Sequence, residues 1–594
     1  MKRTGKACSA GFVAVCLGVV MAGVGPSAAA STGDGPSGAA QVTSLESYWE
    51  GQVTPAAGAM TQGPLLKSKL LAKSQPDECF AGIGKPYPVG TRDAKGNLVC
   101  PEGSQPKVNQ AYVWGLAKAG DHLWFGTGPN IHCLVQGSYL QSTAANQTDS
   151  WVCEGEQSSY RTTWTPGVTL PAALGDFRPP DLFMYDQSAK KLVNKAVLLD
   201  ATGRARLHST LGIRSGGASA NRVFLAGPSI SGGLNVFVFD VDGRYIGSEN
   251  LAGYSNIRKW VTVQGRLYTG VRAGNGGNIL RFTGSSVADP FQYEVVGNLT
   301  SEPAEFAEHQ GRLFVSTWPA AGMASVWMSP LVGRDKKLTS ADAAAWQSVW
   351  NAGQYEPDPV TAATYGGGAL ASFNGKLIWG TMHVPMTAAL AHAARYGPSA
   401  DTAGQLANIL GSNRAISIFS LELRPGGLAP SVTLLYGSPT LPVYDGTSWT
   451  LQPNTMAGVE PLYGPSGFGN TFNNYTWTMS VYGGSLYVGT MDWSYILSEG
   501  LASAFPELGL PQGTQLSLIG NQFGADLWRF GPKGGPAVAE SVDGVGNYAN
   551  YGIRTMVSDD ALYLGTANPM NLMTDPSDDK PAGGWELLRL RPVK

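Results

Sequence analysis

One short phrase recurs seven times along this chain and constrains its fold more than any other feature. Each copy is a turn followed by an aromatic or aliphatic strand, and most copies end in Gly-Thr or a close variant. The copies are GDHLWFGT from Gly120, NRVFLAG from Asn221, GRLYTG from Gly265, GRLFVST from Gly311, GKLIWGT from Gly375, GSLYVGT from Gly484 and DALYLGT from Asp560. A strand motif repeated in this way indicates a radial or stacked β array, in which each unit buries its faces only against its neighbours.

The unit around Gly265 shows the size of one repeat. Four strands are predicted in it, with turn residues between them. These strands are Ile257–Val263, Arg266–Val271, Asn278–Phe282 and Phe291–Val296. Four strands within about 40–45 residues is the size of a propeller blade. The repeats therefore predict an all-β, seven-bladed β-propeller over residues 108–594, and an eighth, degenerate blade around Val443–Leu451 is left open.

The repeat also resembles a known class of protein. The pattern GxLYVGT, followed by a strand such as DLWRF from Asp526 or NILRF from Asn278, is similar to generic β-propeller repeat proteins of the secreted bacterial type. This resemblance covers nearly all of the chain after its N-terminal segment, and it implies the fold. It implies no activity, because the dipeptides of WD40 blades, the paired glycines of kelch blades and the Asp-box of sialidases do not recur in register.

The last repeat is short of one strand. Its third strand, WELLRL from Trp585, runs almost to the final residue of the sequence. A blade left with three strands would expose a long strand edge. We therefore expect a segment between Gln41 and Lys107 to supply the missing strand and close the ring.

The N-terminus has the pattern of an export signal. Lys2, Arg3 and Lys6 precede a short apolar stretch, and Ala28 to Ala30 forms an A-x-A cleavage site. Residues 1–30 are thus predicted to be a signal peptide, and the protein to be secreted or periplasmic after cleavage near Ala30. Residues 31–107 would form a leader with a disulfide loop, of which 31–45 is expected to be flexible because it is rich in Gly, Ser, Ala and Thr.

Charge and hydropathy exclude several partner classes. The net charge is −2, and no basic run follows the signal, which argues against nucleic-acid binding. No later stretch approaches the ~20 apolar residues of a spanning helix, so the mature chain is expected to lack a membrane span. We expect a monomer.

Four cysteines follow the signal: Cys79, Cys100, Cys133 and Cys153. An even number of cysteines in an exported chain indicates two disulfides, for which three pairings exist. We favour Cys79–Cys100 and Cys133–Cys153, because each bridge closes a Gly/Pro/Ser-rich loop that contains no core strand.

Four long loops follow the second strand of a predicted blade. They are Gly128–Pro180, Met382–Arg414, Met491–Gly524 and Ala567–Gly584. Insertions on one face of a repeat protein usually mark its binding face. The segment from Pro385 is predicted to be an Ala-rich helix, and the segment from Ser494 is largely apolar. These loops would either pack on the blade tops or cover an apolar ligand cleft.

The residues expected to bind a ligand lie at the starts of the inner strands and in these loops. They are Asn109, Arg258, Tyr475, Trp477, Trp493, Arg554 and Asn568. Amide, aromatic and guanidinium groups suit a glycan-like or partly apolar small molecule. Trp493 is expected at the rim, where it would stack on the ligand and support little of the core. The alternative is that the asparagines only form turns.

Two other functions stay open. An extracellular hydrolase or lyase would use the carboxylates of Glu302, Glu305 and Asp492 with the imidazole of His383. A structural surface protein would only contact other proteins. We predict no metal site, although His383 with Met382 and Met386 offers the soft ligands that copper prefers, since methionine clusters usually line apolar surfaces. The sequence identifies no cofactor.

Overall fold

The computed structural model describes residues 38–52, 64–164, 168–219, 221–284, 289–332, 337–504, 510–511, 514, 518–520, 522–574 and 582–593. The predicted signal peptide, 1–30, lies outside these ranges. Within them, no helix is long and apolar enough to cross a membrane.

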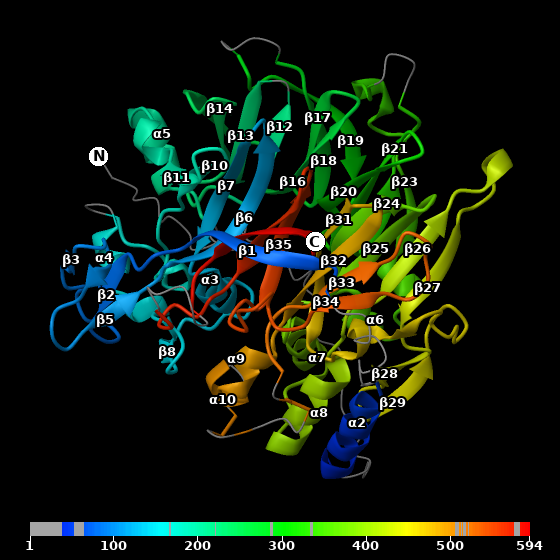
Figure 1. Ribbon diagram of the computed structural model, residues 1–594. Helices are drawn as coiled ribbons and strands as arrows, with labels where there is room; N and C mark the ends of the chain where they lie inside the picture. The colour runs from blue at the N-terminus through cyan, green and yellow to red at the C-terminus, as the bar shows by residue number, and fades with distance from the viewer. Residues whose placement is uncertain are drawn as a thin grey trace, which may run out of the picture.

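Successive antiparallel strands pair in sets of four (Figure 1). The first three sets are β6 (Gln110–Ala119), β7 (His122–Pro129), β10 (Leu182–Asp186) and β11 (Lys191–Asn194); β12 (Ser215–Ser219), β13 (Arg222–Pro228), β14 (Leu234–Asp240) and β15 (Tyr245–Leu251); and β16 (Asn256–Val263), β17 (Arg266–Ala273), β18 (Gly276–Phe282) and β19 (Tyr293–Leu299). The next two are β20 (Glu302–His309), β21 (Arg312–Trp318), β22 (Ser325–Met328) and β23 (Gln347–Asn351); and β24 (Gly366–Phe373), β25 (Lys376–Met382), β26 (Ile418–Glu422) and β27 (Ser431–Gly437), to which β30 (Gly464–Pro465) adds. The last two are β31 (Asn473–Tyr482), β32 (Ser485–Asp492), β33 (Leu527–Phe530) and β34 (Val538–Ser541); and β35 (Gly552–Ser558), β36 (Leu562–Ala567) and β37 (Glu586–Pro592), completed by β1 (Leu66–Lys73).

The N-terminal strand β1 supplies the fourth strand that the last set lacks. It pairs antiparallel with β37 from Leu66 opposite Pro592 to Lys73 opposite Glu586. Figure 1 shows the blue β1 lying along the red β37, near the C-terminus of the chain. The outer edge of the last set is therefore covered by a segment from the other end of the sequence.

The first strands of neighbouring sets are in contact all the way round. In order they are β6, β12, β16, β20, β24, β31 and β35, and β35 returns to β6. Such a ring of inner strands, each followed by three outer strands, defines a β-propeller. Some neighbouring sets are joined by one pair of residues, such as Met382 with Tyr475, so that several sets form one 17-stranded sheet. The number of blades therefore stays a prediction.

Every copy of the repeated phrase forms the second strand of its set. In five copies a threonine hydroxyl at the end of this strand accepts a hydrogen bond from the backbone N–H that begins the third strand. The pairs are Asp181 to Thr127 (2.8 Å), Ser325 to Thr317 (3.0 Å), Ser417 to Thr381 (3.0 Å), Asp526 to Thr490 (2.9 Å) and Glu586 to Thr566 (2.8 Å). The threonine thus satisfies a backbone donor at the place where the chain rejoins the sheet after the loop between the second and third strands.

The glycine beside this threonine allows the next blade to approach. A Cβ added to Gly126 would lie 2.2 Å from the Cβ of Ile213, and one added to Gly489 would lie 2.8 Å from the Cβ of Ile553. Both partners belong to the following set. The Gly-Thr pair therefore serves blade-to-blade packing rather than ligand chemistry.

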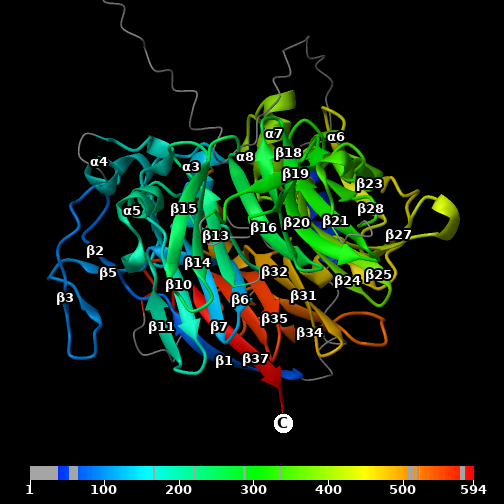
Figure 2. The ribbon, with the colours of Figure 1, turned by 90° about the horizontal axis from the view of Figure 1, so that it is seen from above.

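The helices lie mainly in the long loops. They are α2 (Gly38–Gln52), α3 (Ile131–Ser138), α4 (Tyr160–Thr163), α5 (Ala201–His208), α6 (Pro359–Ala362), α7 (Thr387–Tyr396), α8 (Thr402–Ser412), α9 (Ser494–Ser498) and α10 (Leu501–Ala504). Short 3-10 turns are η2 (Gly155–Gln157), η3 (Ala172–Leu174), η4 (Ala196–Leu198), η5 (Ser340–Asp342), η6 (Ala352–Gln354), η7 (Pro425–Gly427) and η8 (Ser466–Gly469). Figure 2 shows α3, α7 and α8 along one side of the inner strands.

The leader differs from the expectation of a flexible segment. Helix α2 occupies 38–52, so the predicted flexibility of 31–45 is wrong from Gly38 onward. The reason is tertiary packing, because Trp49 is buried and its Nε1 donates a hydrogen bond to the Leu410 carbonyl of α8 at 2.9 Å. Tyr48 also donates to the Thr440 carbonyl at 2.8 Å.

Both favoured disulfides, Cys79–Cys100 and Cys133–Cys153, are confirmed. The first lies in a small module built from the pairs β2 (Glu78–Phe80) with β5 (Gln105–Lys107) and β3 (Thr91–Arg92) with β4 (Leu98–Val99). The second joins α3 to β9 (Val152–Cys153), which pairs with β8 (Asn146–Gln147).

The segment left open as an eighth blade is a hairpin. Its strands β28 (Thr440–Tyr444) and β29 (Trp449–Pro453) pair only with each other among the described residues. The eighth-blade alternative is therefore wrong for this segment, because two strands cannot form a four-stranded blade.

Candidate functional site

A small cavity lies at the starts of the inner strands, beneath the long loops. Its volume is about 60 Å³. The lining residues are Tyr112, Trp114, Ile131, Leu134, Val135, Tyr139, Leu211, Arg214, Arg258, Trp318, Val384, Tyr475, Trp477, Met491, Trp493, Tyr551 and Arg554. These residues come from many blades and from three of the long loops, so the cavity exists only in the assembled ring.

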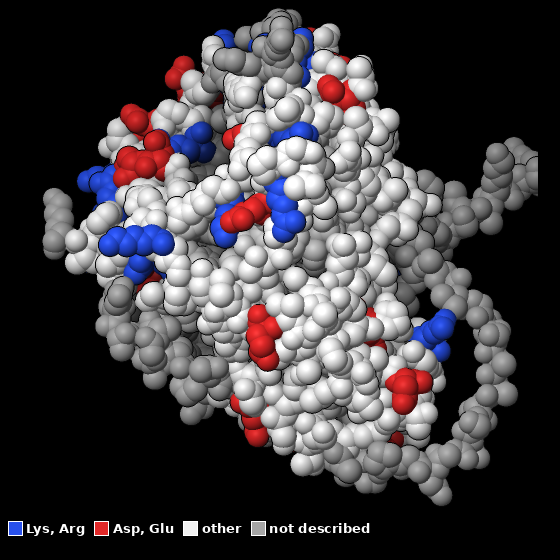
Figure 3. Space-filling model, turned by 90° about the vertical axis from the view of Figure 1, so that its right-hand side faces the viewer, with Lys and Arg blue, Asp and Glu red and all other residues white. Residues whose placement is uncertain are grey.

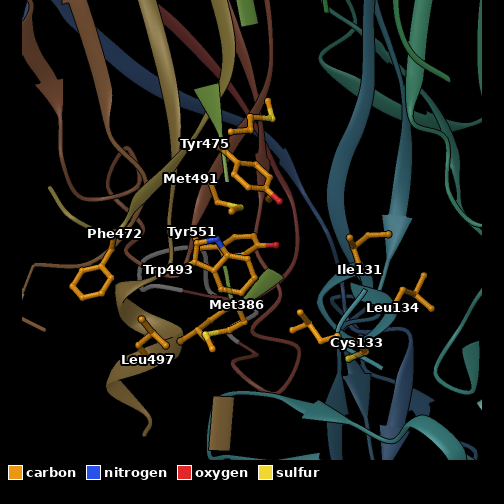
Figure 4. Packing of buried hydrophobic residues seen from close by; sticks show 14 of the residues in the cluster. Ile131, Cys133, Leu134, Met386, Phe472, Tyr475, Met491, Trp493, Leu497 and Tyr551 are labelled. Atoms are coloured by element: carbon orange, nitrogen blue, oxygen red, sulfur yellow. The ribbon is translucent and has the colours of Figure 1, made fainter. Parts of the chain in front are cut away.

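The four long loops meet over this cavity. Ile131, Met386, Trp493 and Met570, one from each loop, belong to a single buried apolar cluster that also contains inner-strand residues such as Tyr475. Figure 4 shows Ile131, Leu134 and Cys133 on one side of the view and Trp493, Tyr551 and Met386 on the other. The loops therefore share one face of the propeller, as their common position in the repeats predicts.

Three arginines line the cavity, and each lies over a tryptophan ring. The guanidinium carbon of Arg258 is 3.9 Å from the ring centre of Trp318, that of Arg214 is 4.7 Å from Trp114, and that of Arg554 is 5.6 Å from Trp477. Cation–π contacts of this kind hold a planar guanidinium against one wall.

The carboxylates nearby only partly balance these cations. Glu302 binds Arg258 (Nε to Oε1, 3.4 Å) and Arg272 (Nη1 to Oε2, 3.5 Å). Glu305 lies 3.5 Å from Lys259 and 4.0 Å from Arg554. In the part of the chain that the structure describes, no carboxylate lies within 4.0 Å of Arg214, whose Nη1 donates to the neutral Asn256 side chain at 2.7 Å.

Burial lowers the pKa of two of these arginines. Removal from water, followed by the positive charge of Arg258, lowers the pKa of Arg214 to about 9. Burial also lowers the pKa of Arg554 to about 10, although the Glu305 carboxylate opposes this shift. Both groups still carry a full charge at neutral pH, which burial makes costly unless a partner compensates it.

Five of the seven residues expected to bind a ligand line this cavity: Arg258, Tyr475, Trp477, Trp493 and Arg554. The other two, Asn109 and Asn568, are buried in hydrogen-bond networks outside it. The Asn109 amide donates to Asp77 Oδ1 at 3.0 Å, and the Asn568 amide donates to the Ala582 carbonyl at 2.7 Å. These two asparagines stabilise turns and loops through their hydrogen bonds. This agrees with the alternative that the asparagines only form turns.

Trp493 is buried rather than placed at an exposed rim. Only 3% of its surface is accessible, and its ring lies 5.6 Å from Tyr551 and 5.8 Å from His132. The expectation that it supports little of the core is therefore wrong, because the long loops close over it. It separates the cavity from a second one of about 50 Å³ that the loop helices enclose.

The candidate catalytic carboxylates do not line the cavity. Glu302 and Glu305 are engaged by the cations described above. Asp492 accepts hydrogen bonds from the Ser494 backbone N–H at 2.7 Å and from the Asn470 amide at 2.6 Å, and burial raises its pKa. His383 lies apart from these three, on the second cavity.

His383 and the neighbouring methionines are buried among other side chains. The His383 Nε2 is 3.1 Å from the Thr381 hydroxyl, and burial, aided by the charge of Arg414, holds its pKa well below the usual value. Met382 and Met386 are buried in the apolar cluster. Among the described residues, no group of three His, Cys, Asp or Glu side chains could hold a metal ion.

Sequence reasoning missed several lining residues, including Arg214, Trp114 and Trp318. Arg214 precedes β12, whose sequence SGGAS carries no apolar alternation. A search for a cation at the start of each inner strand would have found it, since Arg258 and Arg554 occupy similar places in β16 and β35.

No protein-family model matches this chain, and no curated protein matches it in sequence. Solved structures with a similar fold include a prolyl endopeptidase, at 10% identity and a TM-score of 0.34, over 82% of this chain and 51% of that chain. The β-propeller domain of the trilobed protease from Pyrococcus furiosus is 7% identical, with a TM-score of 0.31, over 81% of this chain and 95% of that one.

An exo-β-1,3-galactanase from Phanerochaete chrysosporium is 10% identical, with a TM-score of 0.26, over 68% of this chain and 79% of that chain. This chain spans about half the length of the prolyl endopeptidase. The strand pairings and the ring contacts of this chain itself define its class, which is a generic β-propeller.

Proposed function

We propose that this protein is a secreted or periplasmic propeller that binds a partly apolar small molecule in the covered cavity at the mouth of its central channel. The observation that carries the proposal is the lining itself. Aromatic walls from several blades and an apolar roof from separate loops converge on one space with a few polar groups. Ligand sites in proteins have this composition. The two disulfides suit an oxidising compartment.

The lining favours ligand binding over the two alternatives. A hydrolase would usually place a carboxylate or a histidine in the site to transfer protons, and the described lining residues include no carboxylate and no histidine. A purely structural protein would need no unfilled space beneath a roof. A partly apolar ligand also fits these walls better than a neutral glycan, because amide side chains are missing from the described lining.

Filling the cavity tests the proposal. Val384 lies in the loop between β25 and α7 and lines both cavities. We expect Val384→Trp to abolish saturable binding of small aromatic probes such as benzoate. Quenching of tryptophan fluorescence measures this binding. The matched control is Val481→Trp, since Val481 is 39% exposed and lies outside the lining. Unchanged binding in Val384→Trp would contradict the proposed site.

A further inference from the structure

The proposed site carries more positive than negative charge, and the excess lies inside the molecule. Arg214, Arg258 and Arg554 line the cavity with 5%, 8% and 4% of their surfaces accessible. Arg258 and Arg272 pair with the carboxylate of Glu302, and Lys259 and Arg554 lie within 4.0 Å of the carboxylate of Glu305, so two carboxylates serve four cations. Among the described residues, no carboxylate lies that close to Arg214. By contrast, Figure 3 shows a face on which charged side chains of both signs are scattered among uncharged ones.

Two of the guanidinium groups have unused donors. Within the part of the chain that the structure describes, the buried Nε of Arg214 and the buried Nε of Arg554 have no hydrogen-bond partner. A buried, unpaired donor costs more on a charged group than on a neutral one, and native structures keep few such donors. Both groups line the same cavity, where one acceptor could reach them.

Tyrosine hydroxyls add neutral donors to the same space. Burial raises the pKa of Tyr475 and of Tyr551, so both hydroxyls stay protonated and can donate. In Figure 4 these two hydroxyl groups point toward the side on which Ile131 and Leu134 lie. The lining of the cavity thus combines several hydrogen-bond donors and positive charge with apolar side chains.

Resting on the proposed function, we infer that the ligand of this cavity is an anion with an aromatic or other flat apolar body, its negative head held by Arg214, Arg258 and Arg554. The head would compensate the charge that Glu302 and Glu305 leave unbalanced. Guanidinium groups are well suited to it because their fixed donors match a carboxylate or another oxyanion. The tryptophans beneath the arginines hold these donors in place and shape the walls for the flat body.

A series of three probes with one shape and three charges tests this inference. Benzoate, benzamide and benzamidine share the ring and differ in the charge of the head. We expect benzoate to bind roughly tenfold more tightly than benzamide, because charge-assisted hydrogen bonds are stronger than neutral ones, and benzamidine to bind weakest. Acetate, which has the head without the ring, should bind more weakly than benzoate. Calorimetry or tryptophan fluorescence at constant salt measures the four affinities.

Arginine variants test whether these side chains cause the preference for benzoate over benzamide. Arg214→Gln and Arg554→Gln should each weaken benzoate roughly tenfold and leave benzamide nearly unchanged, whereas Arg214→Lys should keep part of the preference because it keeps the charge. The matched control is Arg244→Gln, since the Arg244 side chain is 74% exposed and pairs with Asp240 in a distant turn. Thermal unfolding of each variant shows whether it is folded, and the probe series on the unaltered protein stands even where a variant fails to fold.

The outcomes separate the two proposals. If benzamide binds as tightly as benzoate, or if the arginine variants weaken both probes equally, the anionic ligand is wrong while the binding site survives. If none of the aromatic probes binds saturably, the proposed function fails and the inference fails with it.

Discussion

Gly565 packs directly against Val113. Gly565 lies in β36 of the last set of strands, and Val113 lies in β6 of the first set. A Cβ added to Gly565 would lie 2.4 Å from Cγ1 of Val113. The nearby pairing of Ala567 with Tyr112 joins β36 to β6 at the same place. The two ends of the propeller thus meet through a contact that only glycine permits, and the ring of inner strands closes there.

Gly565→Ala should therefore destabilise the protein by about 1–3 kcal/mol, because the added methyl forces β36 away from β6 in a packed core. Urea unfolding measures the loss. Gly531→Ala is the control, since nothing lies within 4 Å of the added Cβ there. Equal stability of the two variants would show that ring closure does not depend on this contact.

Thr490→Val should lower the free energy of unfolding by about 1–3 kcal/mol, because it leaves buried polar groups unpaired. The Thr490 hydroxyl accepts from the Asp526 N–H at 2.9 Å and donates to Asn473 Oδ1 at 2.8 Å. Thermal unfolding should show a much smaller change for Thr450→Val, which alters an exposed threonine of β29. A loss as large in the exposed variant would mean that valine itself, and not the missing hydroxyl, is responsible.

Asp526 should make stability depend on pH. Burial, together with the charge of Asp492, raises the pKa of Asp526 to about 7 from an ordinary value of 3.8. The folded protein then holds a proton that the unfolded chain releases, so the free energy of unfolding falls as pH rises between about 4 and 7, by about 4 kcal/mol at most.

Asp526→Asn should flatten this part of the stability curve and be more stable than the unaltered protein at pH 8. The asparagine oxygen can still accept from the Asn473 amide, which is 2.6 Å from Asp526 Oδ2. Chemical unfolding between pH 4 and 8 measures the difference. Asp242→Asn, in an exposed turn, should follow the unaltered curve. If the stability curves of Asp526→Asn and of the unaltered protein run parallel, Asp526 does not hold the extra proton in the folded state.

Trp493→Ala should cost about 3–5 kcal/mol, because it empties a buried site between the two cavities. Trp493→Phe should lose less and retain more probe binding. Calorimetry gives the stability, and the benzoate titration gives the affinity. Leu451→Ala, at a residue 48% exposed, is the control. A melting temperature that Trp493→Ala leaves unchanged would show that the loops do not close over this ring in solution.

Local pattern was sufficient for most of the fold. Strand alternation and turn residues identify the repeated unit, because a strand's pairing partner is usually its sequence neighbour in such a protein. The disulfides could be predicted for a similar reason, since Cys79–Cys100 and Cys133–Cys153 each close a short loop. The missing fourth strand even indicated that an N-terminal segment such as β1 must pair with β37.

The site depended on the ring. Arg258, Tyr475 and Arg554 could be proposed as neighbours because each lies near the start of an inner strand, and Arg214 immediately precedes one. Trp318, the last residue of β21, carries no such signal. Likewise, the sequence of α2 predicts a flexible leader, and only the packing of Trp49 on α8 explains why this segment is a helix. Hydrogen-bonded strands follow from contacts between near neighbours in the chain. The direction of each side chain at the channel mouth is set instead by how all the inner strands pack against one another, and that arrangement exists only when the ring is closed.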